Sequence, residues 1–191
     1  MMMQTIHFVT SNASKFTEAQ SILGKDIGFT LLHSQQELPE LQGEFDQIVT
    51  HKCMQAAQHI KGAVLVDDAG IGFNALNGLP GPYTKPFLKK IGTAGLLEML
   101  ENCCNKSAQA ICVLGYTTGP NQAIQLFHGI VDGKIITPLQ HARTKEFGFD
   151  SIFQPNGSEL SYSNMGLVKK NSTSHRYKAL MLFKSFFANQ T

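Results

Sequence analysis

The chain has 191 residues, a length that suits one domain with a sizeable hydrophobic core. Its composition is 42% hydrophobic and 16% charged, which is typical of a globular protein and not of a disordered one. The formal net charge of +2 is too small to argue for binding to nucleic acid.

Membrane and secretory signals are missing from the sequence. No apolar stretch reaches the roughly 18 residues that a membrane span needs, and the start MMMQTIHFVT lacks a basic segment followed by a long apolar one. The cysteines form no CxxC pair and stand at Cys53, Cys103, Cys104 and Cys112. We therefore expect reduced thiols in a cytoplasmic protein that does not bind a membrane.

The first elements predict a strand, a polar loop and a helix. The run TIHFVT, residues 5–10, is rich in strand-forming residues, and SNASK interrupts it with turn and cap residues. In KFTEAQSIL, residues 15–23, apolar residues recur at helical spacing. A second strand is expected over residues 29–34.

The middle of the chain predicts a helix, a strand and two short helices. Over residues 45–60 the apolar residues lie on one helical face, with Lys52 near its edge. The run AVLVDD, residues 63–68, predicts a strand that ends at Asp67 and Asp68. Short helices are expected over residues 84–91 and 94–103.

The last part of the chain predicts two strands, over residues 108–118 and 123–131, joined by a turn at residues 119–121. A closing helix is expected over residues 174–187. The order of all these elements indicates the α/β class, one domain over residues 1–191, and a mixed sheet that is partly parallel and ends in an antiparallel hairpin.

The segment TSNASK, Thr10 to Lys15, is a candidate anion site. It stands between a strand and a helix, where backbone N–H groups attract anions, and Lys15 adds a positive charge. The GxxxxGK[ST] pattern of a P-loop is absent. An ordinary capped loop is the alternative interpretation.

The acidic residues are candidates for a metal site; they are Glu18, Glu40, Glu44, Asp67 and Asp68. Mg²⁺ prefers carboxylate oxygens and usually bridges to substrate phosphates. Adjacent residues on a strand point to opposite faces, so Asp67 and Asp68 can face one site only if the strand ends or bends there. A solvated turn is the alternative.

Cations stand next to several loops and helix ends, at Lys15, Lys52, Lys85, Lys170 and Arg176. Hydrolysis of a nucleoside triphosphate needs its charge of about −4 neutralised, and such cations facing a carboxylate cluster would do this. Ordinary surface lysines are the alternative.

Two further motifs are candidates for ligand recognition, the first for a base and the second for an anion. In FGFD, residues 147–150, aromatics beside a glycine can stack on a base and Asp150 can read its edge, although core aromatics before a turn would look the same. His175 and Arg176 stand in the first turn of the closing helix, where cations oppose the helix dipole. That conflict predicts a bound anion or a carboxylate partner.

These motifs, in this order, resemble the inosine triphosphate pyrophosphatase family, also called the non-canonical purine NTP pyrophosphatases, in its eukaryotic form. The resemblance runs from about Ile6 to about Phe187, and its most specific strings are FNALNGLPGPYTK and FGFDSIFQP. It implies an elongated mixed sheet flanked by helices, with two lobes and a central nucleotide-binding cleft. It also implies a homodimer and the hydrolysis of ITP, dITP and XTP to the monophosphate and pyrophosphate, which depends on Mg²⁺ or, as an alternative metal, Mn²⁺.

The resemblance also implies roles for individual residues. Asp68, Lys15 and Glu18 would be catalytic, and Glu40, Asp68 and Asp67 would bind metal, with Glu44 a further member of the acidic site. The remaining contacts to the nucleotide would come from Thr10, Ser11, Asn12, Ala13, Ser14, Lys15, Lys52, Asp68, Lys85, Phe147, Gly148, Phe149, Asp150, Lys170, His175 and Arg176.

Three positions depart from the family pattern. Ser14 stands where the family has Lys or Gly, Ala69 where Ser or Thr follows the acidic pair, and Phe149 where Trp is common. Since no principal carboxylate or lysine is lost, activity is still expected.

The alternatives are a related pyrophosphatase for other modified nucleotides and a non-catalytic nucleotide-binding protein. An RNA-binding module is disfavoured because the sequence has no basic stripe with an aromatic platform.

Overall fold

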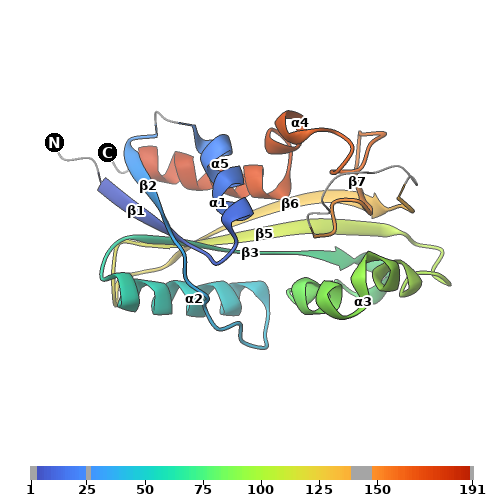
Figure 1. The fold of residues 1–191 in the computed structure, drawn as a ribbon, viewed down its shortest axis with the longest axis horizontal. Coiled ribbons are helices and arrows are strands. Elements are labelled where there is room, and N and C mark those ends of the chain that lie inside the picture. The colour runs from blue at the N-terminus through green and yellow to red at the C-terminus, as the bar shows by residue number, and fades with distance from the viewer. Residues whose placement is uncertain (1–3, 25–26, 139–147, 190–191) are drawn as a thin grey trace. The chain divides into compact units, whose positions relative to one another are not determined.

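The computed structural model describes residues 4–24, 27–138 and 148–189. Along the chain the elements are β1 (Gln4–Val9), α1 (Ala13–Leu23), β2 (Phe29–Ser34), α2 (Phe45–Ile60), β3 (Val64–Phe73), the short 3₁₀ helix η1 (Asn74–Leu76), β4 (Pro80–Gly81), α3 (Thr84–Glu98), β5 (Ser107–Thr117), β6 (Gln125–Ile135), β7 (Phe153–Pro155), α4 (Leu167–Asn171) and α5 (His175–Ala188) (Figure 1).

The strands of the described residues form one seven-stranded sheet in the order β2-β1-β3-β5-β6-β7, with β4 paired to β3. Strand β1 runs parallel to both β2 and β3, whereas the pairs β3–β4 and β6–β7 are antiparallel. The predicted α/β class with a mixed sheet is therefore confirmed. Strands β5 and β6 are neighbours, as the predicted hairpin requires.

The chain divides into two compact units, in line with the two lobes that the resemblance implies. Unit 1 contains Met1–Asp68, Cys112–Gly129 and Arg176–Thr191, and unit 2 contains Ala69–Ile111 and Ile130–His175. The central cleft stays a prediction.

In unit 1, α2 covers one side of the strands, and α1 and α5 cover the other (Figure 1). On the α2 side the strands come close to the helix at Gly115, where a Cβ atom would stand 2.7 Å from Cγ1 of Val49. On the α5 side the rings of Phe29 and Phe187 pack edge to face with their centres 4.7 Å apart. Both faces of this part of the sheet are therefore buried.

Unit 2 has its own core, in which Ile71, Leu96 and Phe153 are fully buried. Helix α3 is broken at Gly92, whose φ of 64° and ψ of −172° are not helical, so two short helices are present as predicted, although the second ends at Glu98 and not at residue 103. The backbone approaches itself closely after β3, because a Cβ atom on Gly70 would clash with the carbonyl oxygen of Gly81.

One predicted boundary is wrong in a way that matters for the site. Strand β3 does not end at Asp67 and Asp68 but continues to Phe73. The acidic pair thus lies inside a buried strand and not in a turn. The reason is that both carboxylates have cationic partners, so the strand can carry them without leaving a charge unpaired.

Candidate functional site

Asp67 and Asp68 lie on opposite faces of β3, as the alternation of side chains along a strand requires. The partners of Asp67 come from α1 and α5, and the partner of Asp68 comes from α2, which covers the other side of the strands (Figure 1). All of these residues belong to unit 1. The predicted acidic site is therefore two ionic clusters, one on each side of the strand.

The first cluster is built around Asp67 and Arg176. Oδ2 of Asp67 lies 3.0 Å from Nη2 of Arg176, and its Oδ1 lies 3.1 Å from Nζ of Lys15. Nη1 of Arg176 reaches Oε2 of Glu18 at 2.6 Å. The carboxylate partner predicted for Arg176 is thus present, in the form of two carboxylates.

The charged groups of this cluster shift one another's pKa values. Although burial alone would raise the pKa of Asp67, Lys15 and Arg176 lower it to about 2. Burial would lower the pKa of Arg176, but Asp67 and Glu18 raise it above its ordinary value. Asp67 is therefore ionised at any physiological pH, and its oxygens are already engaged by two cations, which makes it a poor candidate for binding a metal.

The second cluster is built around Lys52, which α2 carries into the protein. Nζ of Lys52 lies 2.9 Å from Oδ1 of Asp68 and 3.1 Å from Oε1 of Glu40. The side chains of Lys52 and Asp68 are nearly buried, whereas 35% of the Glu40 side chain is exposed. The predicted grouping of these three residues is present, and one of its members is open to solvent.

Burial and a neighbouring cation act on the acidity of Asp68 in opposite directions. Burial raises its pKa above the ordinary value, and the attraction of Lys52 offsets only part of this rise. Burial would lower the pKa of Lys52, but Asp68 and Glu40 raise it above the ordinary value. A buried carboxylate next to a fixed cation is an arrangement that recurs at functional sites.

The carboxylates of Glu40 and Asp68 could supply two of the oxygen ligands of a Mg²⁺ ion. They offer hard oxygen ligands that converge on one point, the Nζ atom of Lys52. Within residues 4–24, 27–138 and 148–189, no three His, Cys, Asp or Glu side chains gather in a way that would hold a metal. A site of this kind suits an ion whose remaining ligands are water and substrate phosphates.

The loop after β1 is organised by Asn12, which caps α1. Its Oδ1 accepts hydrogen bonds from the backbone N–H groups of Ser14 and Lys15, at 3.0 and 3.4 Å. Its own backbone N–H donates to Oγ1 of Thr10 at 3.1 Å. The side chain of Asn12 therefore occupies two of the N–H groups that the sequence predicted for an anion. Ser11 and Ala13 are exposed beside them.

Unit 2 holds a second set of predicted site residues. Nζ of Lys170 lies 2.6 Å from Oδ2 of Asp150, and both side chains are buried. The ring of His175 packs 5.7 Å from that of Phe149, and Gly148, in a left-handed conformation, precedes this pair. An aromatic and charged group of this composition can recognise a base by stacking and by hydrogen bonds.

The sequence interpretation missed Tyr162, which stacks on His175 at an angle of 26° with the ring centres 5.7 Å apart. Lys170 also lies over its ring, at 5.8 Å from the centre. No spacing pattern connects Tyr162 to His175, so only the fold reveals it.

The remaining predicted residues have different surroundings. Lys85 is exposed in the first turn of α3 in unit 2. Glu44 caps α2 in a capping box with Gln47, so its local role is structural. Phe147 lies outside the described residues. The structure therefore gives no reason to place Glu44 among the metal ligands.

Nearly the whole chain is similar to a known family. The model of the Ham1 family matches residues 6–186. Two curated proteins named inosine triphosphate pyrophosphatase are each 43% identical: the one from Schizosaccharomyces pombe aligns over 98% of this chain and 97% of its own length, and the one from Candida albicans over 98% and 100%.

A solved structure of a HAM1 protein from Coxiella burnetii has the same fold. It superposes with a TM-score of 0.87 at 26% identity and covers 98% of this chain and 100% of its own. Among the residues that the structure describes, no helix is long and apolar enough to cross a membrane.

Proposed function

Because this chain belongs to the Ham1 family, we propose that it is a nucleoside triphosphate pyrophosphatase. Its substrates would be the non-canonical purine nucleotides ITP, dITP and XTP, and its products the monophosphate and pyrophosphate. By removing these nucleotides it would cleanse the nucleotide pool. The observation that carries the proposal is Lys52, buried between the carboxylates of Asp68 and Glu40.

Glu40 and Asp68 would hold a Mg²⁺ ion, or Mn²⁺, together with oxygens of the substrate. The ion, when bound, neutralises phosphate charge and makes the phosphorus more electrophilic. Lys52, whose pKa is raised by the two carboxylates, stays protonated and supplies a fixed positive charge to a phosphate oxygen.

Asp68 would accept the proton of the attacking water. Its carboxylate is buried and its pKa is raised, which brings it closer to the value that a general base needs at neutral pH. The water would attack the phosphorus nearest the sugar, and pyrophosphate would leave. Lys15 lies in the first turn of α1 and is paired with Asp67 of β3. It would be the cation of the segment from Thr10 to Lys15 that contacts the phosphates.

Residues of unit 2 would read the base. His175, Phe149 and Tyr162 form a buried cluster of rings, continuous with the core of this unit, that would border the base. Asp150 and Lys170 supply a buried acceptor and donor. Fixed polar groups of this kind reject a base that leaves them unpaired, which is the basis we propose for selecting a 6-oxopurine. We also propose a cytoplasmic homodimer.

The test is a substrate panel. Purified protein is incubated with ITP, dITP, XTP, GTP and ATP, with and without Mg²⁺, and the released pyrophosphate is measured. Metal-dependent release from ITP and XTP, well above that from ATP, is expected. Release from modified pyrimidine triphosphates alone would point to the related pyrophosphatase. Nucleotide binding without any release would point to a non-catalytic protein.

A further inference from the structure

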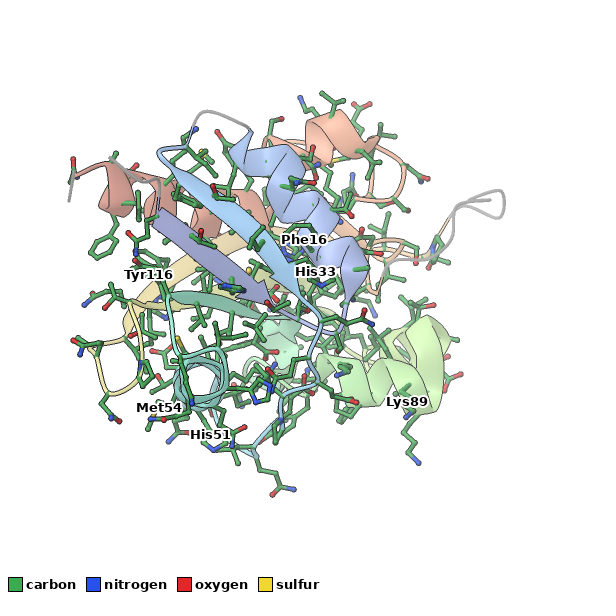
Figure 2. All side chains as sticks on the ribbon, turned by 60° about the vertical axis from the view of Figure 1, so that its left-hand side comes forward. Phe16, His33, His51, Met54, Lys89 and Tyr116 are labelled. Atoms are coloured by element: carbon green, nitrogen blue, oxygen red, sulfur yellow. The ribbon has the colours of Figure 1, made fainter. Side chains whose placement is uncertain are left out.

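His33 lies at the end of β2 and touches both ends of the segment 10–16. Its ring stacks on that of Phe16, with centres 4.7 Å apart and planes at 11° (Figure 2). Its Nε2 lies 3.0 Å from the backbone carbonyl oxygen of Thr10. Thr10 begins the loop that leads into α1, and Phe16 follows Lys15 in the first turn of that helix. No motif of the sequence marked this histidine.

The direction of the hydrogen bond from His33 is fixed by its partner. A carbonyl oxygen can only accept, so Nε2 of His33 carries the proton and donates it. Since Nε2–H is present in both the protonated ring and one neutral tautomer, the contact does not depend on the charge of the ring. His33 is therefore a permanent donor to the start of the loop.

The contact with Thr10 continues into the helix through a chain of hydrogen bonds. The backbone N–H of Thr10 donates to the carbonyl of Ser34 at 3.2 Å, so β2 holds both the N–H and the carbonyl oxygen of this residue. Thr10 Oγ1 then accepts from Asn12, and the side chain of Asn12 accepts from Ser14 and Lys15. Fixing Thr10 thus fixes the backbone up to Lys15.

We propose that His33 is a positioning residue that clips the segment 10–16 into the shape that receives the triphosphate. It holds the first residue of the segment through a hydrogen bond and the last through ring stacking, and Lys15 lies between the two. The proposal rests on the proposed function, because it assumes that this loop binds phosphates. A loop that is ordered in advance loses less conformational entropy on binding. Removing the His33 contacts should therefore raise KM more than it lowers kcat.

Three variants separate the clip from a general structural role. His33→Phe keeps a ring to stack on Phe16 but removes the N–H donor. His33→Gln keeps an N–H donor without the ring. His7→Phe is the matched control, because His7 also makes a histidine hydrogen bond between β1 and β2, to Oγ of Ser34 at 2.8 Å, without contacting the loop backbone.

The first measurement is hydrogen exchange of the backbone amides in residues 11–16, which needs no activity. His33→Phe should speed exchange in this segment and leave the rest of β1 and β2 unchanged, whereas His7→Phe should not affect the segment. Equal acceleration throughout unit 1, or no change in the segment, would overturn the proposal.

The second measurement is steady-state hydrolysis of ITP. Loss of one hydrogen bond should raise KM by about threefold to tenfold in His33→Phe, with kcat changed less, and His33→Gln should recover most of the loss. A fall in kcat with unchanged KM would overturn the proposal. If the unchanged protein does not hydrolyse ITP, the proposed function fails, and hydrogen exchange still decides whether His33 clips the loop.

Discussion

Asp67 and Asp68 are neighbours in β3, yet their carboxylates pair with different lysines on opposite sides of the strand. Oδ1 of Asp67 lies 3.1 Å from Lys15, and Oδ1 of Asp68 lies 2.9 Å from Lys52. The two residues also differ in acidity, because the pKa of Asp67 is lowered to about 2 while that of Asp68 is raised. One acidic dipeptide thus supplies a permanent structural charge and a candidate proton acceptor.

Replacing Asp68 by Asn should abolish most of the hydrolysis of ITP. Loss of a general base typically costs about 10²- to 10⁴-fold in rate, and the amide is also a weaker metal ligand. The measurement is kcat/KM with saturating Mg²⁺, alongside circular dichroism to show that the fold is kept. Asp46→Asn, at an exposed residue of the same unit that pairs with His128, is the matched control and should be neutral. Near-normal turnover by Asp68→Asn would remove Asp68 from its proposed role.

The lowered pKa of Asp67 predicts a loss of stability in acid. The folded-state pKa of about 2 lies below the ordinary value of 3.8, so ionised Asp67 stabilises the fold above pH 4, and this contribution disappears as the pH falls from 4 to 2. The contribution is about 2 kcal/mol at neutral pH. Urea unfolding between pH 2 and pH 7 should show this dependence, and Asp67→Asn should be less stable at pH 7 and show a flatter curve in acid. Parallel curves for the two proteins would contradict the assignment.

Replacing Arg176 by Met should destabilise the protein strongly. The buried carboxylates of Asp67 and Glu18 would lose their shared partner, and removing one partner from a buried ion pair typically costs about 3–5 kcal/mol. Arg176→Lys should cost less, since it keeps the charge but not the two-sided hydrogen bonding. The free energy of unfolding in urea measures both changes. An effect of Arg176→Met below about 1 kcal/mol would show that the two carboxylates do not need Arg176 to be stable in the folded protein.

Much of the fold could be predicted because its long elements carry strong periodic patterns. The bounds of β2 and α2 match the prediction, and the buried face of α2 contains Val49 and Cys53 as expected. Strands β4 and β7 and helix α4 are too short to show a periodicity, and they were missed. Sequence patterns report local burial, so short elements held only by tertiary pairing escape them.

The candidate site could be predicted in part. The grouping of Lys52 with Glu40 and Asp68 was expected from the resemblance and is present. The pairing of Arg176 with Asp67 joins residues 109 positions apart, and no local pattern encodes it. The true end of β3 was missed for the same reason, because aspartate is a poor strand former until distant cations neutralise it.

The buried thiols should be chemically inert in the folded protein. Burial raises the pKa of both Cys53 and Cys112 to about 12, so almost no thiolate exists at pH 8. Cys104 is exposed and should react first. Iodoacetamide labelling followed by mass spectrometry should modify Cys104 in the folded protein and the two buried thiols only after unfolding in urea. Rapid labelling of Cys53 without denaturant would contradict the burial of this side chain on the inner face of α2.

The position of Lys52 predicts that it competes with a metal ion for the same carboxylates. Its Nζ lies where the oxygens of Glu40 and Asp68 converge, so a divalent cation entering there meets a positive charge. Lys52→Gln should therefore raise the affinity of the nucleotide-free protein for Mn²⁺ by roughly tenfold. At the same time ITP turnover should fall, because the phosphate loses its cation.

Electron paramagnetic resonance of Mn²⁺ measures this affinity without any turnover. Lys89→Gln, at an exposed lysine of α3 (Figure 2), is the matched control for a change of one charge and should alter neither quantity. If Lys52→Gln binds Mn²⁺ as weakly as the unchanged protein, Glu40 and Asp68 do not form the metal site. A rise in affinity with full ITP turnover would instead separate Lys52 from catalysis while keeping the two carboxylates as ligands.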